Sequence, residues 1–132
     1  MNNTLKVVFT IALLISVSAC SNLRPINNIE KSVIASSMTT DNIQTAIITA
    51  ANRRGWLIDE ITDKEVTLTL HARSHTARVR VPYTTENYSI IYVSSQNLKQ
   101  RGNKIHNNYN RWVNNLDIEI RRELSLTAIK NK

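Results

Sequence analysis

The sequence predicts an α+β domain in which one helix precedes, and another follows, a four-stranded antiparallel meander. Two segments, at about 42–54 and 107–128, repeat their apolar residues with the period of a helix. Between them, apolar and polar side chains alternate in short segments, which is typical of strands with one buried face. Because the connections are short, sequential strands should be neighbours, and both helices are expected on the apolar face of the sheet.

The first helix is predicted from its apolar face and from its two ends. Asp41 and Gln44 are residue types suited to the cap and the third helical position. Arg53 and Arg54 fall in the last turn, where the helix dipole favours cations, and Gly55 follows as the stop. The apolar residues that share one helical face are Ile43, Ala46, Ile47, Ala50 and Ala51.

Four short strands are predicted between the helices. The stretch 56–61 is rich in strand formers, and clear alternation follows at 66–73 and 76–81. The connection between these two is short enough only for an antiparallel hairpin, and a loop of two or of four residues places apolar side chains opposite each other. Residues 88–93 make the fourth strand.

A polar loop at 94–105 is expected to lead into the second helix. Asn107 or Asn108 is a suitable cap for that helix. Its apolar stripe includes Trp112, and the second strand carries Leu70 on its apolar face. Both side chains are therefore predicted to lie in the core.

Residues 1–19 have the pattern of a bacterial secretion signal. The apolar run at 7–17 is shorter than the roughly 20 residues that a membrane-spanning helix needs. It ends in Val-Ser-Ala-Cys at 17–20, which resembles the lipobox read by lipoprotein processing enzymes. The alternatives are an ordinary signal with a coincidental cysteine, a short membrane anchor and a buried helix.

Cys20 is the residue expected to carry the lipid. It is the only cysteine of the chain, so no intramolecular disulfide is available to it. Small side chains before it allow cleavage between Ala19 and Cys20, the thiol takes a diacylglycerol thioether, and the new amine is open to acylation. Several acyl chains give stable membrane anchoring. Ser21, which is not Asp, favours the outer membrane facing the periplasm, by resemblance to enterobacterial sorting.

The mature chain is divided into the lipidated cysteine with a flexible tether, at 20–38, and a folded α+β domain, at 39–130. The first of these segments is polar, with scattered aliphatic residues and no clear period. A coil of this kind would lift the domain clear of the headgroups. An edge strand is the alternative interpretation.

Four segments of the domain resemble, in matching order over about 41–124, a family of small proteobacterial lipoproteins. They are Arg54-Gly55-Trp56, Tyr88-Ser89-Ile90-Ile91-Tyr92, Ser94-Ser95-Gln96-Asn97-Leu98, and Ile105-His106-Asn107-Asn108-Tyr109-Asn110-Arg111-Trp112-Val113-Asn114-Asn115-Leu116. The Ile-His-x-x-Tyr-Asn-x-Trp-Val segment is the most distinctive. The resemblance implies lipidation at the lipobox, and it brings no established activity or catalytic residue.

The basic surface of the predicted hairpin is the best lead for a binding site. The formal net charge is +7, which suits anionic partners such as acidic lipid headgroups or glycan polymers. Arg73, Arg78, Arg80 and His71 are expected on one outward face, suited to binding carboxylates or phosphates. The alternative is a solvated sheet face without a partner. An envelope location argues against nucleic acid.

No catalytic, cofactor or metal signature is present in the sequence. The two glycines, Gly55 and Gly102, do not make a phosphate-binding loop. His71 and His75 straddle the hairpin turn, but no acid or cysteine near them in sequence completes a metal site. His106 is expected either to cap or line a pocket or to support its neighbours by packing.

Two polar clusters have ordinary structural explanations. The carboxylates at 59–65 are interpreted as a solvated turn, and the asparagines at 107–115 either contact a glycan or hydrogen-bond the preceding loop. We therefore expect a non-enzymatic envelope lipoprotein without a cofactor, held on a membrane through Cys20, that binds an envelope protein or an anionic glycan or lipid. A carrier with a sheet–helix cleft for an apolar or amphipathic ligand is the alternative.

Overall fold

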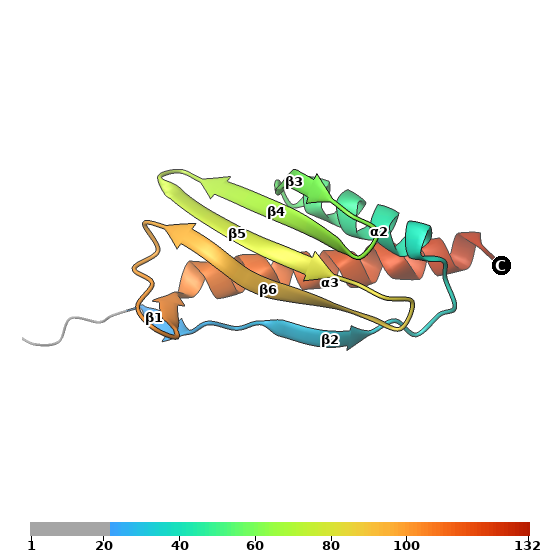
Figure 1. Ribbon diagram of the computed structural model, residues 1–132, viewed down its shortest axis with the longest axis horizontal. Helices are drawn as coiled ribbons and strands as arrows, with labels where there is room; N and C mark the ends of the chain where they lie inside the picture. The colour runs from blue at the N-terminus through green and yellow to red at the C-terminus, as the bar shows by residue number, and fades with distance from the viewer. Residues whose placement is uncertain (1–21) are drawn as a thin grey trace, which may run out of the picture.

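An antiparallel sheet of five strands and two helices form a mixed α+β fold (Figure 1). The computed structural model describes residues 22–132, so the predicted signal and Cys20 lie outside the described residues. Within that range, no helix is both long and apolar enough to cross a membrane. The elements in chain order are β1 (Leu23–Pro25), β2 (Ile29–Val33), α2 (Thr40–Arg53), β3 (Leu57–Ile61), β4 (Glu65–Ala72), β5 (His75–Pro82), β6 (Asn87–Gln96), β7 (Lys104–His106) and α3 (Asn107–Lys130).

The predicted four-stranded meander is part of a larger sheet. The strand order is β2-β6-β5-β4-β3, so the four predicted strands are consecutive neighbours, as expected. The prediction was wrong in that β2 adds a fifth strand beside β6, and in that β1 and β7 form a separate two-stranded ribbon. The predicted loop at 94–105 therefore contains the end of β6 and most of β7, and its Leu98 is buried.

The prediction of a flexible tether at 20–38 was wrong, because this segment contains two of these strands. β1 and β2 fall inside that segment, and the alternative interpretation of an edge strand describes β2. Lys31 has a φ of 49°, and the pairing register of β2 with β6 shifts between Ile29 and Ser32. This irregularity breaks the alternation of side chains along β2. The segment consequently lacks the period that identifies a strand in the sequence.

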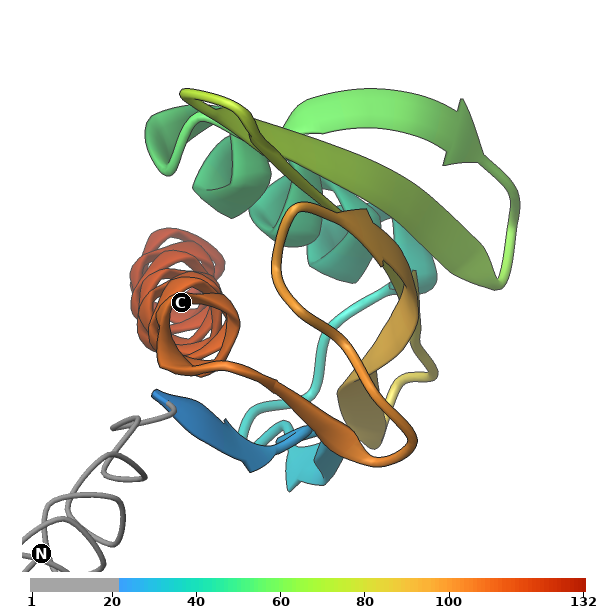
Figure 2. The ribbon, with the colours of Figure 1, turned by 90° about the vertical axis from the view of Figure 1, so that its left-hand side faces the viewer.

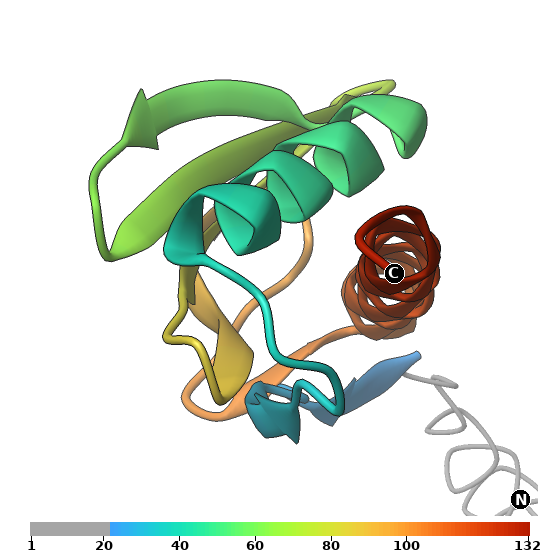
Figure 3. The same ribbon diagram turned by 90° about the vertical axis from the view of Figure 1, so that its right-hand side faces the viewer.

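The core lies between the sheet and the two helices. The sheet curves around α2 and α3, which lie side by side on its concave face (Figures 2 and 3). Alternate side chains of β4, such as Val66 and Leu68, are fully buried, as the sequence predicts. Leu70 is also buried, whereas Trp112 is only partly buried against the core. The prediction for Trp112 was therefore only partly right.

The β4–β5 hairpin takes the shorter of the two expected loops. Ala72 pairs with His75, so Arg73 and Ser74 alone form the loop. Arg73 has a φ of 57°, in the left-handed region. The register places Leu70 opposite Ala77, so apolar side chains face each other across the hairpin.

The first helix ends at the predicted glycine. Gly55 has a φ of 77°, its N–H donates to the Asn52 carbonyl, and the Trp56 N–H donates to the Ala51 carbonyl at 2.9 Å. This pair of bonds is a Schellman motif, which glycine allows because the left-handed conformation costs it little. The motif turns the chain so that Trp56 enters the core, where it is 2% exposed.

The helix starts differ from the predicted ones by a few residues. Thr39, not Asp41, caps α2, and its hydroxyl accepts a hydrogen bond from the Asn42 N–H. His106, not an asparagine, caps α3, with its Nδ1 accepting from the Asn108 N–H at 3.2 Å. This places His106 in one of the roles expected for it, that of a cap.

Candidate functional site

The predicted basic sheet face is exposed but paired with acids. The Arg78 Nε lies 3.5 Å from Asp59 Oδ2, and the Arg80 Nη1 lies 3.1 Å from Glu65 Oε2. Asp59 also accepts a 2.6 Å hydrogen bond from the Thr69 hydroxyl. Asp59 and Glu65, two of the acids at 59–65 that were interpreted from the sequence as a solvated turn, thus share a face with the arginines. The face presents ion pairs rather than an isolated positive charge.

The remaining members of that face lie at the hairpin end. Arg73 occupies the loop, and the exposed His71 contacts the Thr76 hydroxyl through Nδ1 at 3.2 Å. His75 instead contacts the Asn97 carbonyl, through Nδ1 at 2.7 Å. Among residues 22–132, no group of three or more histidine, cysteine or carboxylate side chains gathers as metal ligands would.

We expect the combined Arg73→Gln, Arg78→Gln and Arg80→Gln variant to behave like the wild type. Exposed ion pairs contribute about 1 kcal/mol or less each, so its thermal midpoint should move little. Because acids already neutralise two of the arginines, its retention on peptidoglycan and on anionic vesicles should also equal that of the wild type. Pull-downs at low and high salt measure this. A selective loss of retention in the variant would restore the sheet face as the binding surface.

Three carboxylates are buried on the inward side of α3. Asp117, Glu119 and Glu123 are 5%, 4% and 8% exposed. Arg54 at the end of α2 lies 3.3 Å from Glu119, and Arg53 lies 3.0 Å from Glu123. These pairs join the two helices where the negative end of the α2 dipole also favours cations. The arginines predicted from the sequence to end α2 therefore also bind α3.

Asp117 belongs to a buried polar group that includes Tyr88 and Arg121. The Tyr88 hydroxyl donates a 2.6 Å hydrogen bond to Asp117 Oδ1, and the Arg121 Nε lies 3.1 Å from Asp117 Oδ2. Burial, together with this hydrogen bond to Asp117, raises the pKa of Tyr88 well above its usual value. Interaction with Tyr88 and with the Asp117 carboxylate raises the pKa of Arg121 as well, so it stays a cation.

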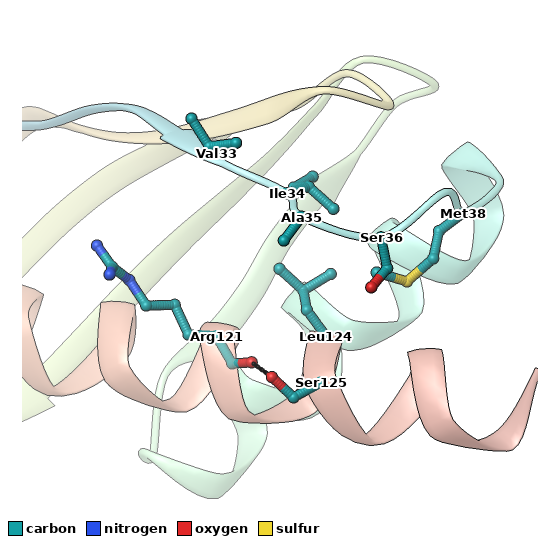
Figure 4. A pocket seen from close by; sticks show the side chains of 8 residues that line it. All are labelled: Val33, Ile34, Ala35, Ser36, Met38, Arg121, Leu124 and Ser125. Atoms are coloured by element: carbon teal, nitrogen blue, oxygen red, sulfur yellow. Dashed lines mark hydrogen bonds between the residues drawn. The ribbon is translucent and has the colours of Figure 1, made fainter.

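A groove lies beside Arg121, between the β2–α2 connection and α3. Leu124 points from α3 toward Ile34 and Ala35, and Arg121 leaves the helix on the same side (Figure 4). The groove has a volume of about 200 Å³. That is below the roughly 300–1,000 Å³ of typical small-ligand pockets. The residues that line it are Val33, Ile34, Ala35, Ser36, Met38, Arg121, Leu124 and Ser125.

Other hollows of the described residues lie at the surface. One of about 140 Å³ is lined by Arg54, Trp56, Leu70, Trp112 and Asn115. Another, of about 400 Å³, is lined by residues that include the cations Lys31 and Lys64. The space between sheet and helices is filled by one continuous core. The alternative of a ligand carrier with a sheet–helix cleft stays a prediction.

The N-terminal end of α3 holds the beginning of the described chain. The Asn107 N–H donates to the Asn22 carbonyl at 2.9 Å. The Asn110 amide donates to the Pro25 carbonyl and accepts from the Asn27 N–H, at 2.9 and 3.0 Å. Of the two roles expected for these asparagines, hydrogen bonding to the backbone is thus seen for Asn110, but its partner is the 22–27 segment and not the 94–105 loop.

Comparison with known proteins does not add to this geometry. No protein-family model matches the chain, and no curated protein matches it.

The outward side of α3 forms a surface that was not predicted from the sequence. Arg111, Arg121 and Arg122 are exposed there, as are the aliphatic Ile118 and Ile129. The spacing of these residues along the helix can be read from the sequence. The sequence does not show that all three acids of the helix are buried. Arg121 pairs with Asp117 and Arg122 pairs with Glu119 at 3.5 Å, whereas Arg111 has no acidic partner within residues 22–132.

Proposed function

We propose that this chain is a lipoprotein of the bacterial cell envelope, anchored through Cys20, with a non-enzymatic binding or structural role. The observation that carries the proposal is where the fold begins. The lipobox ends at Cys20, and β1 starts at Leu23. Cleavage before Cys20 would therefore remove the signal and leave every described strand and helix intact. The resemblance to small proteobacterial lipoproteins supports the same assignment, and Ser21 favours the outer membrane facing the periplasm.

A binding or structural role fits the way the polar side chains are used. Each of the three buried carboxylates faces an arginine. His71, His75 and His106 each have their own local contact. Residues of this kind stabilise a fold, and they supply no pair of groups arranged for catalysis.

The position at which the fold begins also determines how close to the membrane the domain would lie. Asn22 is bonded to the first residue of α3, and Cys20 is two residues before it. Two residues span at most about 7 Å. An acylated Cys20 would therefore hold the N-terminal end of α3 at the headgroup region, without the long tether that the sequence suggested.

Substitution of Cys20 by serine should abolish lipid attachment. A hydroxyl is a far weaker nucleophile than a thiolate, so no thioether forms and the processing peptidase loses its substrate. Metabolic labelling with a fatty-acid probe measures the effect, with Ser21→Ala as the matched control that keeps the thiol. We expect a labelled band in wild type and control and none in the Cys20→Ser variant. Equal labelling of all three would contradict the anchor.

A further inference from the structure

The charged side chains of α3 are sorted by sign between its two sides. Its acids, Asp117, Glu119 and Glu123, are all buried, whereas its bases are all exposed. The bases are Arg111, Arg121, Arg122 and Lys130. Four arginines pair with these carboxylates: Arg53 with Glu123, Arg54 and Arg122 with Glu119, and Arg121 with Asp117, whereas Arg111 and Lys130 make no ion pair within residues 22–132. The outward side of the helix therefore carries a net positive charge.

Exposed aliphatic side chains lie among these cations. Ile118 is 51% exposed and Ile129 is 69% exposed. Arg111, Ile118, Arg122, Ser125 and Ile129 are separated by three, four or seven residues, so they fall on one stripe of the helix. We call these five residues the α3 stripe. Leu126, 40% exposed, lies beside it.

We propose that the α3 stripe lies on a bilayer surface that contains anionic phospholipids, with the arginines at the phosphates and the isoleucines among the headgroups. A helix with a cationic and aliphatic outward side has the chemistry of an interfacial helix. The inference rests on the proposed lipid anchor, which would hold Asn22, the residue bonded to the start of α3, within about 7 Å of the acylated cysteine. The helix, about 36 Å long, would then lie along the same membrane.

The anchor makes even a weak surface contact effective. Once the chain is held at one end, docking of the stripe is intramolecular, and its effective concentration is high. Each arginine near an anionic surface strengthens the contact by about fivefold. A second copy of the chain is a poor occupant, because two stripes with the same charge repel each other.

The test uses the mature lipidated protein, which begins at Cys20, reconstituted into vesicles. An environment-sensitive fluorophore is attached at Ile118→Cys, and at Leu57→Cys as a matched site, since Leu57 on β3 is 57% exposed. Spin-labelled lipid in the bilayer quenches a fluorophore that lies at its surface. The vesicles contain phosphatidylglycerol with phosphatidylethanolamine, or phosphatidylcholine alone. If Ile118→Cys does not fold, Ser125→Cys provides a second site on the α3 stripe.

We expect quenching at position 118 in the anionic vesicles, weakened by salt because exposed charges are screened over about 8 Å at physiological ionic strength. Position 57 should stay unquenched. Arg111→Gln should lower the ratio of docked to undocked protein by about fivefold, and adding Arg122→Gln should lower it further but by less, because Arg122 pairs with Glu119; Arg78→Gln with Arg80→Gln should leave the ratio unchanged. Arg111 makes no ion pair within residues 22–132, so Arg111→Gln alone tests the charge without disturbing the fold.

Three results would overturn the inference. The first is equal quenching at positions 118 and 57, and the second is equal effects of the two arginine pairs. The third is a blue-shifted signal at 118 in detergent that grows with protein concentration, which would mean that a second copy covers the stripe. If Cys20 is not lipidated, the proposed function fails independently of this inference. Wild-type protein would then react with the thiol-reactive fluorophore at its free Cys20.

Discussion

Substitution of Trp56 by alanine should lower the free energy of unfolding by about 3–5 kcal/mol, the largest effect we expect from any single side chain. Trp56 is 2% exposed and is among the largest fully buried side chains of the core. The Schellman motif at the end of α2 fixes its entry into the core, so its neighbours cannot easily close the space it leaves. Chemical denaturation followed by circular dichroism measures the loss.

Trp112→Ala is the matched control for this prediction. It removes the same side chain from a position that is only partly buried, beside His75 at a ring-centroid distance of 6.4 Å. Because less apolar surface returns to water, its effect should be clearly smaller. Equal losses for the two variants, or an unchanged midpoint for Trp56→Ala, would contradict the core described for this fold.

Raising the pH above about 10 should destabilise the domain through two buried tyrosines. Burial is the main cause that raises the pKa of both Tyr88 and Tyr109 in the folded state. Below pH 10 both side chains are protonated in the folded and unfolded chain, so their contribution to stability is complete. Above pH 10 only the unfolded chain releases the protons, and each tyrosine lowers the free energy of unfolding by about 1.4 kcal/mol per pH unit.

The two tyrosines can be separated by phenylalanine variants. At pH 7, Tyr88→Phe should cost about 1.5–3 kcal/mol, because it removes a hydrogen bond to a charged group, whereas Tyr109→Phe should be neutral or stabilising. The Tyr109 hydroxyl is buried without a hydrogen-bond partner in the described residues. In the variant with both substitutions, the free energy of unfolding from denaturation curves should fall much less above pH 10 than it does in the wild type. A decline as steep as that of the wild type would show that other groups cause it.

The elements that could be predicted from the sequence are those whose pattern is local. Val66 and Leu68 alternate with polar residues, and both are fully buried on one face of β4. The apolar face of α2 likewise follows the helical period, and Gly55 ends the helix as expected. In these segments burial on one side alone determines the spacing of apolar residues.

The strands at 23–33 could not be predicted because distant residues stabilise them. The Lys31 N–H donates to the Ser89 hydroxyl, and the Asn110 side chain bonds to both Pro25 and Asn27. Such contacts join residues far apart in the chain, and they leave no period in the local sequence. The same reason applies to β7, whose partner is β1.

The candidate site was predicted only in part because ion pairs depend on register. Arg78 and Arg80 are exposed on the outward face, as alternation requires. The pairing of β3 with β4 shifts between Ile58 and Glu60, and Asp59 at this irregularity bonds to Thr69 on the neighbouring strand. A position of this kind is set by three strands together, so the neutralised face was not evident from any one of them.

The intact mass of the protein isolated from cell membranes tests the proposed anchor most directly. Cleavage before Cys20 and acylation of that residue predict a mass that lacks residues 1–19 and gains a diacylglyceryl group, with or without a further acyl chain on the amine. Fragmentation should place the added mass on the N-terminal cysteine. A full-length chain of 132 residues, or a shorter one whose Cys20 thiol is free, would contradict the account.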